Sequence, residues 1–119
     1  MDPVVTFPGE GERFERENRT ITILVDRPGL SIFEMAFDET FVVDPHTHDD
    51  HDDAFLVLEG EVEFTVGDDT LRAGPGTVLS APPGVRHGFR SAGGHARVLN
   101  FHAPDAGFAA FIRSPQAAS

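Results

Sequence analysis

Histidine and acidic side chains gather in one short segment of this 119-residue chain, at a spacing that suits metal binding. His46 and His48 lie two residues apart, and on a strand such residues point to the same face. Two neutral imidazoles with a carboxylate nearby form a nitrogen and oxygen site for a first-row metal ion. Asp53 begins the next apolar stretch, and His87 follows a stiff Pro-Pro-Gly turn. The alternative for a His-x-His pair alone is a pair of surface histidines in an acidic loop.

The segments that must position these side chains are short, apolar and separated by turn residues. Alternation of apolar and polar residues predicts half-buried strands, and paired Gly, Pro and Asp residues predict the turns. Because no segment between about residues 20 and 102 keeps a helical period, the pattern predicts an all-β sandwich or barrel. Residues 105–112 are expected to form a short C-terminal helix with Asp105 as its cap. The expected strands are Thr20–Val25, Ser31–Phe37, Phe55–Leu58, Glu61–Val66, Thr70–Ala73, Thr77–Ala81, His87–Arg90 and Arg97–His102.

Composition excludes several classes of protein. The net charge is −11, from 20 acidic residues against 9 basic residues, all of them arginine. Such a field repels nucleic acid and anionic membranes, so neither is an expected partner. Without cysteine the chain has no disulfide and no thiolate metal site. No apolar run has the length of a membrane span, and the N-terminus lacks the features of a signal peptide, so we expect a cytoplasmic location. The lysine-free, alanine-rich and arginine-rich usage suggests a bacterial genome rich in G and C.

Two segments of the sequence resemble the two motifs of the cupin family. The first family motif is G(X)5HXH(X)3,4E(X)6G, and this chain has His46-Thr47-His48, four residues, Asp53, six residues and Gly60. The second is G(X)5PXG(X)2H(X)3N, and this chain has Gly76, five residues, Pro82-Pro83-Gly84, two residues, His87, and Ser91 at the last position. Two motifs in order and in register are far more specific than either alone. The resemblance covers about residues 20–113.

The resemblance implies a double-stranded β-helix, a small jelly-roll barrel with a metal ion inside. Its metal ligands correspond to His46, His48, Asp53 and His87, and the cofactor would be one divalent ion per chain: Fe, Mn, Ni, Cu or Zn. Three positions depart from the family pattern. Thr40 and Ser91 replace a glycine and an asparagine that are not ligands. Asp53 replaces a glutamate and is one methylene shorter, which leaves three alternatives: it binds the metal directly, binds it through a water molecule, or does not bind it. Without direct binding the centre is a three-histidine site with more open positions.

The other side chains of the acidic segment remain open to two interpretations. His51 falls outside the family spacing, and we expect a loop histidine near the mouth of the site, with direct ligation as the alternative. Asp49, Asp50 and Asp52 are expected to be solvated loop acids rather than ligands. His95 follows a Gly-Gly turn and is expected to be exposed.

Several side chains are candidates for the surroundings of the metal. Apolar residues that share a face with the ligands could line a pocket or simply form the core: Phe33, Met35, Phe37, Phe55, Val57, Phe64 and Phe89. His102 would orient substrate if the even-numbered face of the last strand points inward, and would lie on the surface otherwise. Arg72, Arg86 and Arg90 flank the second motif and could clamp an acidic substrate, although surface charges are the simpler interpretation. No tyrosine is available as acid, base or radical carrier.

Three functions fit the resemblance, because fold alone does not decide function. The first is a metal-dependent, dioxygenase-like enzyme acting on a small organic molecule, similar to small cupins that resemble quercetin dioxygenase, with Asp53 and His102 as catalytic residues. The second is a non-oxidative isomerase, cyclase or lyase that acts on a sugar acid, keto acid or polyketide through a Lewis-acid metal. The third is a cupin that binds a small ligand without turnover.

The expected organisation is one domain over residues 1–119. The barrel would span about residues 20–104, with flexible ends at residues 1–12 and 114–119. Open sheet edges need covering, and residues 13–25 could supply an exchanged strand, so we expect a homodimer.

Overall fold

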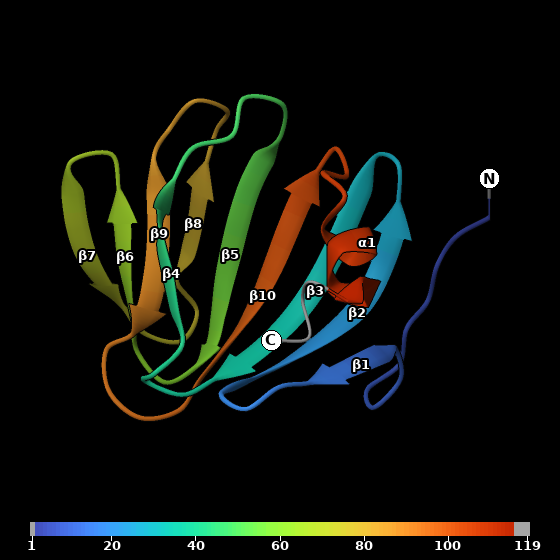
Figure 1. Ribbon diagram of the computed structural model, residues 1–119, viewed down its shortest axis with the longest axis horizontal. Helices are drawn as coiled ribbons and strands as arrows, with labels where there is room; N and C mark the ends of the chain where they lie inside the picture. The colour runs from blue at the N-terminus through green and yellow to red at the C-terminus, as the bar shows by residue number, and fades with distance from the viewer. Residues whose placement is uncertain (1, 116–119) are drawn as a thin grey trace.

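Ten antiparallel strands form two sheets in the computed structural model, which describes residues 2–115 (Figure 1). The larger sheet has the order β1-β2-β3-β10-β5-β8, and the smaller has the order β4-β9-β6-β7. The two sheets curl around one core, and the short helix α1 (Phe108–Arg113) lies beside β2 and β3. This architecture confirms the predicted all-β jelly-roll barrel with a short C-terminal helix. The strands are β1 (Glu12–Glu15), β2 (Arg19–Arg27), β3 (Leu30–Phe37), β4 (Val42–His46), β5 (Asp52–Glu59), β6 (Val62–Val66), β7 (Asp69–Ala73), β8 (Val78–Ala81), β9 (His87–Ser91) and β10 (Ala96–Ala103).

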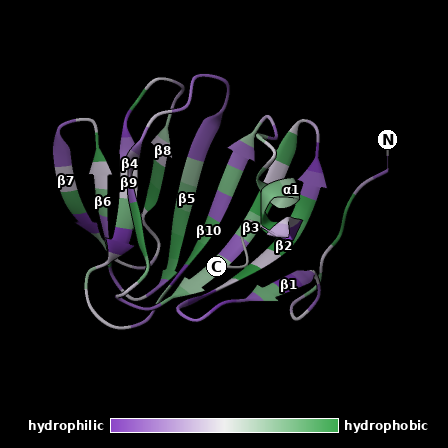
Figure 2. Cartoon of the chain, viewed as in Figure 1, coloured by the Kyte–Doolittle hydropathy of each residue, from purple (hydrophilic) through white to green (hydrophobic). Residues whose placement is uncertain are grey.

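Alternation along the strands builds the core. Every second residue is buried along β3 and β10 and along β5 from Asp53 to Val57, and Figure 2 shows hydrophobic residues along β5. Aromatic rings join the two sheets: Phe55 of β5 lies 5.3 Å from Phe64 of β6 and 5.1 Å from Phe89 of β9, measured between ring centroids. Burying such rings removes large apolar areas from water and supplies much of the stability of a barrel this small.

Each of the eight expected strands overlaps an observed one, but the structure adds two strands that the pattern did not predict. One is β1, whose sequence Glu-Arg-Phe-Glu is mostly charged and exposed. The other is β4, which contains Asp44 and Pro45 and pairs only with β9. Proline is tolerated there because an edge strand leaves backbone donors unpaired. Both strands are held by pairing with a neighbour rather than by their own apolar pattern.

The C-terminal helix begins later than expected, at Phe108 rather than at residue 105. Asp105 is not its cap, which corrects the sequence prediction. The Asp105 carboxylate accepts a hydrogen bond from the Gly107 amide in the turn before the helix, and Gly107 occupies the N-cap position with a left-handed φ of 84°. Glycine adopts this conformation without the steric penalty of a side chain.

The register of two strand pairs determines which side chains meet. In the β4–β9 pair His46 lies directly opposite His87, and in the β5–β10 pair Asp53 lies directly opposite His102. Side chains of directly opposed residues stand on the same face about 5 Å apart. The two pairs belong to different sheets, so the barrel brings both pairs together across its interior.

The described part of the chain contains no helix long and apolar enough to cross a membrane. Residues 2–11 precede β1, and there the Thr6 hydroxyl donates to the carbonyl oxygen of Leu24 at 2.7 Å. Of the C-terminal end that we expect to be flexible, residues 116–119 lie outside the described part.

Gly88 of β9 provides a test of how β4 is positioned. A Cβ atom at Gly88 would lie 2.6 Å from the Val43 carbonyl oxygen and 2.7 Å from the Pro45 nitrogen, both backbone atoms of β4. Gly88→Ala is therefore expected to displace β4 and to lower the free energy of unfolding by about 1–3 kcal/mol. Chemical denaturation measures this change. Gly93→Ala is the matched control, because a Cβ there meets open space; equal stability of the two variants would contradict the prediction.

Candidate metal centre

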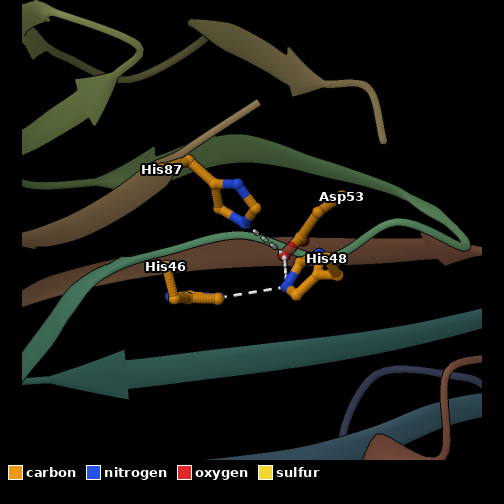
Figure 3. Close-up of side chains that lie close together, drawn as sticks. All are labelled: His46, His48, Asp53 and His87. Atoms are coloured by element: carbon orange, nitrogen blue, oxygen red, sulfur yellow. Dashed lines mark hydrogen bonds and ion pairs between the residues drawn. The ribbon is translucent and has the colours of Figure 1, made fainter. Parts of the chain in front are cut away.

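Three histidines and one aspartate from separate elements converge inside the barrel (Figure 3). The Nε2 atoms of His46 and His48 lie 3.0 Å apart. The Asp53 Oδ2 atom lies 3.0 Å from His87 Nε2 and 3.6 Å from His48 Nε2. One ligand atom from each of the four residues lies within 4.8 Å of every other. The four residues that the motifs indicated are thus brought together, although His48 lies in the loop after β4 rather than on the strand.

Backbone carbonyls fix the orientation of two of these rings. His46 Nδ1 lies 2.9 Å from the Asp44 carbonyl oxygen, and His87 Nδ1 lies 2.9 Å from the Val85 carbonyl oxygen. Since a carbonyl only accepts, each Nδ1 carries a proton, and the lone pair of a neutral ring is then on Nε2, which faces the centre. Hydrogen bonding of the outer ring nitrogen is the usual way in which proteins orient metal-binding histidines.

The donor set fits a divalent first-row metal ion. His46 Nε2 lacks a proton when Nδ1 of its neutral ring carries one, so at 3.0 Å it either accepts a hydrogen bond from His48 Nε2 or shares a cation with it. Three imidazoles and one carboxylate match the ligand preferences of Fe, Mn, Ni, Cu and Zn, and they do not select among these ions. The arrangement therefore supports a metal centre of the class that the sequence indicated.

Burial and hydrogen bonds shift the pKa values of three of the candidate ligands. Burial lowers the pKa of His48 to about 4, with a smaller contribution from His51, so the His48 ring is neutral at pH 7. Burial opposes the charged form of Asp53, but hydrogen bonds from His102, His87 and Asn100 outweigh it and hold its pKa well below the ordinary value. Burial likewise opposes the charged form of His87, yet its hydrogen bond with Asp53 raises the pKa of that ring. The hydrogen bond with Asp53 favours the protonated form of His87, so a metal ion would compete with that proton.

The second oxygen of Asp53 has its own partners. Asn100 Nδ2 donates to Oδ1 at 2.6 Å, and His102 Nε2 lies 3.4 Å from the same atom. The even-numbered residues of β10 point inward, so His102 is buried and does not lie on the surface. The sequence left this open, because Leu99 and Phe101 made the other face of the strand equally apolar.

His51 is a loop residue next to the site, as expected, and it is buried. Its side chain is only 5% exposed, its ring stacks on His48 with centroids 4.0 Å apart, and its Nδ1 pairs with Asp50 at 2.8 Å. With Asp53 and His102 it forms a second group whose potential ligand atoms lie close together. Asp49, Asp50 and Asp52 are exposed, as expected of loop acids, and so is His95.

A cavity of about 250 Å³ adjoins the histidines. His46, His48, Asp53, Asn100 and His102 reach it, and of the apolar wall candidates only Met35 and Phe89 do. The other candidates, Phe33, Phe37, Phe55, Val57 and Phe64, are core residues. Sequence reasoning missed most of the actual lining, which is Phe14, Arg16, Arg19, Ile21, Phe41, Val43, Phe108, Phe111 and Ile112.

The arginines expected near the site are elsewhere. Arg72 pairs with Glu61 at 3.2 Å and Arg90 pairs with Glu63 at 3.2 Å, and neither reaches the cavity. Arg86 is exposed and also lies outside it. Arg16 and Arg19 belong to the run Glu-Arg-Glu-Asn-Arg. From sequence alone such a charged run indicates a solvated segment, and only the hairpin between β1 and β2 shows that its arginines face the cavity.

Comparison with known proteins agrees with this geometry. A family model described as a cupin domain matches residues 33–102. No curated protein matches the sequence. The solved structure of KdgF from Halomonas sp. is 24% identical, with a TM-score of 0.80, over 87% of this chain and 96% of that chain. An RmlC-like cupin from Shewanella frigidimarina is 22% identical, with a TM-score of 0.76, over 85% and 90%. Streptomyces Pac13, described as a unique nucleoside dehydratase, is 16% identical, with a TM-score of 0.67, over 87% and 83%.

Removing single histidines tests the ligand set. His46→Ala and His87→Ala are each expected to lower the metal content of Zn²⁺-loaded or Co²⁺-loaded protein well below one ion per chain, because each removes a nitrogen donor. Elemental analysis after gel filtration measures the content. His95→Ala is the matched control, since His95 is exposed in a turn. Full occupancy in both test variants would show that the ion is held elsewhere.

The paired titration of Asp53 and His87 predicts a pH profile for the metal-free protein. The lowered pKa of Asp53 stabilises the fold above the ordinary value of 3.8, and this contribution is lost as the pH falls further. The raised pKa of His87 stabilises the fold below its ordinary value of 6.5, and this contribution is lost as the pH rises through the folded value. The difference in unfolding free energy between wild type and Asp53→Asn should therefore be largest between about pH 4 and 6.5.

Urea denaturation across the pH range measures this difference. Asp52→Asn changes an exposed residue of the same strand and serves as the control. A difference profile for Asp53→Asn that does not vary with pH would contradict the assignment.

Proposed function

The chain belongs to the cupin family, and from this premise we propose that it is a metal-dependent enzyme that converts a small organic molecule without oxidising it. The reaction class would be isomerisation, ring opening, cyclisation or elimination. The observation that carries the proposal is that three metal-binding candidates and a further buried histidine, His102, reach the same cavity. A cavity of about 250 Å³ is slightly smaller than most small-molecule sites, so the molecule is small.

His46, His48, His87 and Asp53 would hold the ion. A divalent metal ion at this place supplies Lewis acidity, which polarises a bound oxygen group and lowers the pKa of adjacent protons. Asp53 has a dual position, because Oδ2 faces the histidine cluster while Oδ1 faces Asn100 and His102. It therefore also orients the His102 ring.

His102 is the proposed acid–base residue. Its Nε2 atom lies 3.4 Å from Asp53 Oδ1, and its Nδ1 atom is buried and has no hydrogen-bond partner among the described residues. Packing normally satisfies buried polar atoms, so an unsatisfied ring nitrogen beside a cavity favours a role toward a ligand. The rings of Phe33 and Phe108, each with its centroid 5.5 Å from that of His102, exclude water from this side. A dry, oriented imidazole is suited to hold a proton at Nδ1 and to pass it to a bound molecule.

The structural neighbours support a non-oxidative reaction without establishing one here. Pac13 is described as a nucleoside dehydratase, and a dehydration changes no oxidation state overall. It shares the fold with this chain, so a cupin barrel of this size is able to house such chemistry.

The second candidate function is a dioxygenase-like oxidation, and one observation favours it. The cavity wall is largely apolar and includes five phenylalanines, which suits a flat aromatic substrate: Phe14, Phe41, Phe89, Phe108 and Phe111. Oxygen dependence separates the two candidates. The homodimer and the cytoplasmic location stay predictions.

Metal-loaded protein tested with and without oxygen decides between the functions. We expect turnover of a member of a panel of sugar acids, keto acids and dihydroxy-aromatics to require the metal and to continue without oxygen. His102→Gln keeps a donor for Asp53 but carries no titratable proton, so it should retain the metal and lose turnover by about 100-fold or more. His95→Gln is the control.

Three results would contradict this prediction. Oxygen uptake that parallels turnover would favour the dioxygenase, and recovery of a tightly bound molecule unchanged after long incubation would favour a binding protein. Full activity of His102→Gln would remove the proposed acid–base role.

A further inference from the structure

We propose that His51, Asp53 and His102 hold a second divalent metal ion, and that the Asp53 carboxylate bridges it to the ion of the first centre. The first centre is the cluster of three histidines and Asp53 described above. The inference goes beyond the proposed function, which requires only one ion. Neither His51 nor His102 occupies a ligand position of the two sequence motifs.

The three side chains of the second site gather in the interior. One potential ligand atom of each lies within 4.8 Å of the other two. His102 Nε2 lies 3.4 Å from Asp53 Oδ1, and the rings of His51 and His102 have their centroids 5.0 Å apart. All three residues are buried, with exposed fractions of 5%, 5% and 7% for His51, Asp53 and His102. Buried ionisable groups are normally paired or bound to a metal, so this cluster points to a cation.

The contact between His102 and Asp53 is long for a hydrogen bond and has the length expected between two ligands of one ion. An N–H···O hydrogen bond has its heavy atoms about 2.7–3.2 Å apart, whereas His102 Nε2 and Asp53 Oδ1 are 3.4 Å apart. Two ligand atoms about 2.0–2.2 Å from a tetrahedral ion lie roughly 3.3–3.5 Å from each other. An ion on Nε2 leaves the ring proton of His102 on Nδ1, which is the atom that the proposed function uses.

A carboxylate orients the His51 ring from outside the cluster. His51 Nδ1 donates to Asp50 Oδ1 at 2.8 Å, because an ionised carboxylate only accepts, and the lone pair of the neutral ring is then on Nε2. Pairing of the outer ring nitrogen with a carboxylate is a usual support of metal-binding histidines. It is the counterpart of the carbonyl oxygens that orient His46 and His87 in the first centre.

Asp53 presents its two oxygens to different histidines. Oδ2 lies 3.0 Å from His87 Nε2 and 3.6 Å from His48 Nε2 (Figure 3), whereas Oδ1 lies 3.4 Å from His102 Nε2. Asn100 donates to Oδ1 at 2.6 Å and so fixes the plane of the carboxylate. An oxygen that accepts from an amide still has a lone pair for an ion. One oxygen on each of two ions is an arrangement suited to a two-metal site.

Access and charge also favour a second cation at this place. A hollow of about 250 Å³ beside α1 is lined by His51 and His102, which gives an ion a route to both rings. The net charge of −11 and the exposed acids Asp49, Asp50 and Asp52 attract cations and reduce the repulsion between two of them. Two imidazoles and one carboxylate suit a divalent first-row ion and leave further coordination positions open.

Equilibrium dialysis of the full-length protein against increasing Zn²⁺ tests the second site. We expect two ions per chain at saturation. The second ion has three protein ligands, one of them shared, so it should bind more weakly than the first and be lost on gel filtration. His51→Phe keeps an aromatic ring to stack on His48 but offers no nitrogen, and it should lower the saturating content from two ions to one. His102→Gln removes the other imidazole and should have the same effect.

Matched variants control the dialysis. His95→Phe removes an exposed imidazole in a turn, and Asp49→Asn and Asp52→Asn each remove an exposed loop acid. All three should keep two ions, whereas an ion held only by the acidic surface would be lost in the two asparagine variants.

Electron paramagnetic resonance of Mn²⁺-loaded protein tests the bridge. Two Mn²⁺ ions joined by one carboxylate couple their electron spins, and isolated ions do not. We expect the coupled spectrum for the wild type and the spectrum of isolated ions for His51→Phe.

The second site is overturned if the wild type saturates at one ion per chain, or if His51→Phe and His102→Gln fold and still bind two. Loss of the second ion in Asp49→Asn or Asp52→Asn but not in His51→Phe also overturns it. If neither histidine variant folds, the wild-type spectrum decides, and absence of spin coupling at two Mn²⁺ per chain overturns the bridge. None of these measurements depends on turnover, so an inactive protein with two coupled ions keeps the second site and loses the proposed function.

Discussion

The buried carboxylate of Asp53 is the constraint on which the rest of the site depends. A charged group inside a barrel is strongly destabilising unless it is paired and hydrogen-bonded. Asp53 is 5% exposed, and its partners come from β9 and β10, which belong to different sheets. Satisfying this one side chain therefore requires both sheets to close in a single register. The same contacts aim one carboxylate oxygen at the histidine cluster and the other at His102.

Closure of the barrel also prepares the site before any ligand arrives. His46 and His87 face each other through the β4–β9 register, and carbonyl oxygens of Asp44 and Val85 fix their rings. Ligands held on paired strands lose little conformational freedom on binding a metal, so more of the binding energy remains as affinity. The close approach of β4 to Gly88 belongs to the same arrangement, because the backbone that passes over this glycine leads directly into His46.

The sequence predicted an all-β sandwich or barrel from its strand and turn pattern, and the resemblance to the two cupin motifs indicated the four converging residues. The sequence alone did not predict features that depend on which strands pair with each other. Both faces of β10 carry apolar residues, so only the neighbouring strands reveal that His102 points inward. Likewise β1 is a strand because β2 pairs with it, and nothing in the charged run around Arg16 shows that its arginines turn toward a cavity. His51 is the loop residue that the sequence indicated, but its burial depends on stacking against His48, which the sequence does not show.

The negative charge of the chain acts in opposite ways on a metal ion and on an anionic substrate. A net charge of −11 attracts a divalent cation and repels an anionic substrate over the same distances. The histidines and Asp53 benefit from that field, whereas a carboxylate has to enter against it. A cation bound among the histidines would reverse the sign of the potential only at that end of the cavity. Such a cation increases the affinity for an anion in the cavity, and by reciprocity the anion increases the affinity for the metal. An acidic protein of this kind would then hold substrate and metal most tightly when both are present.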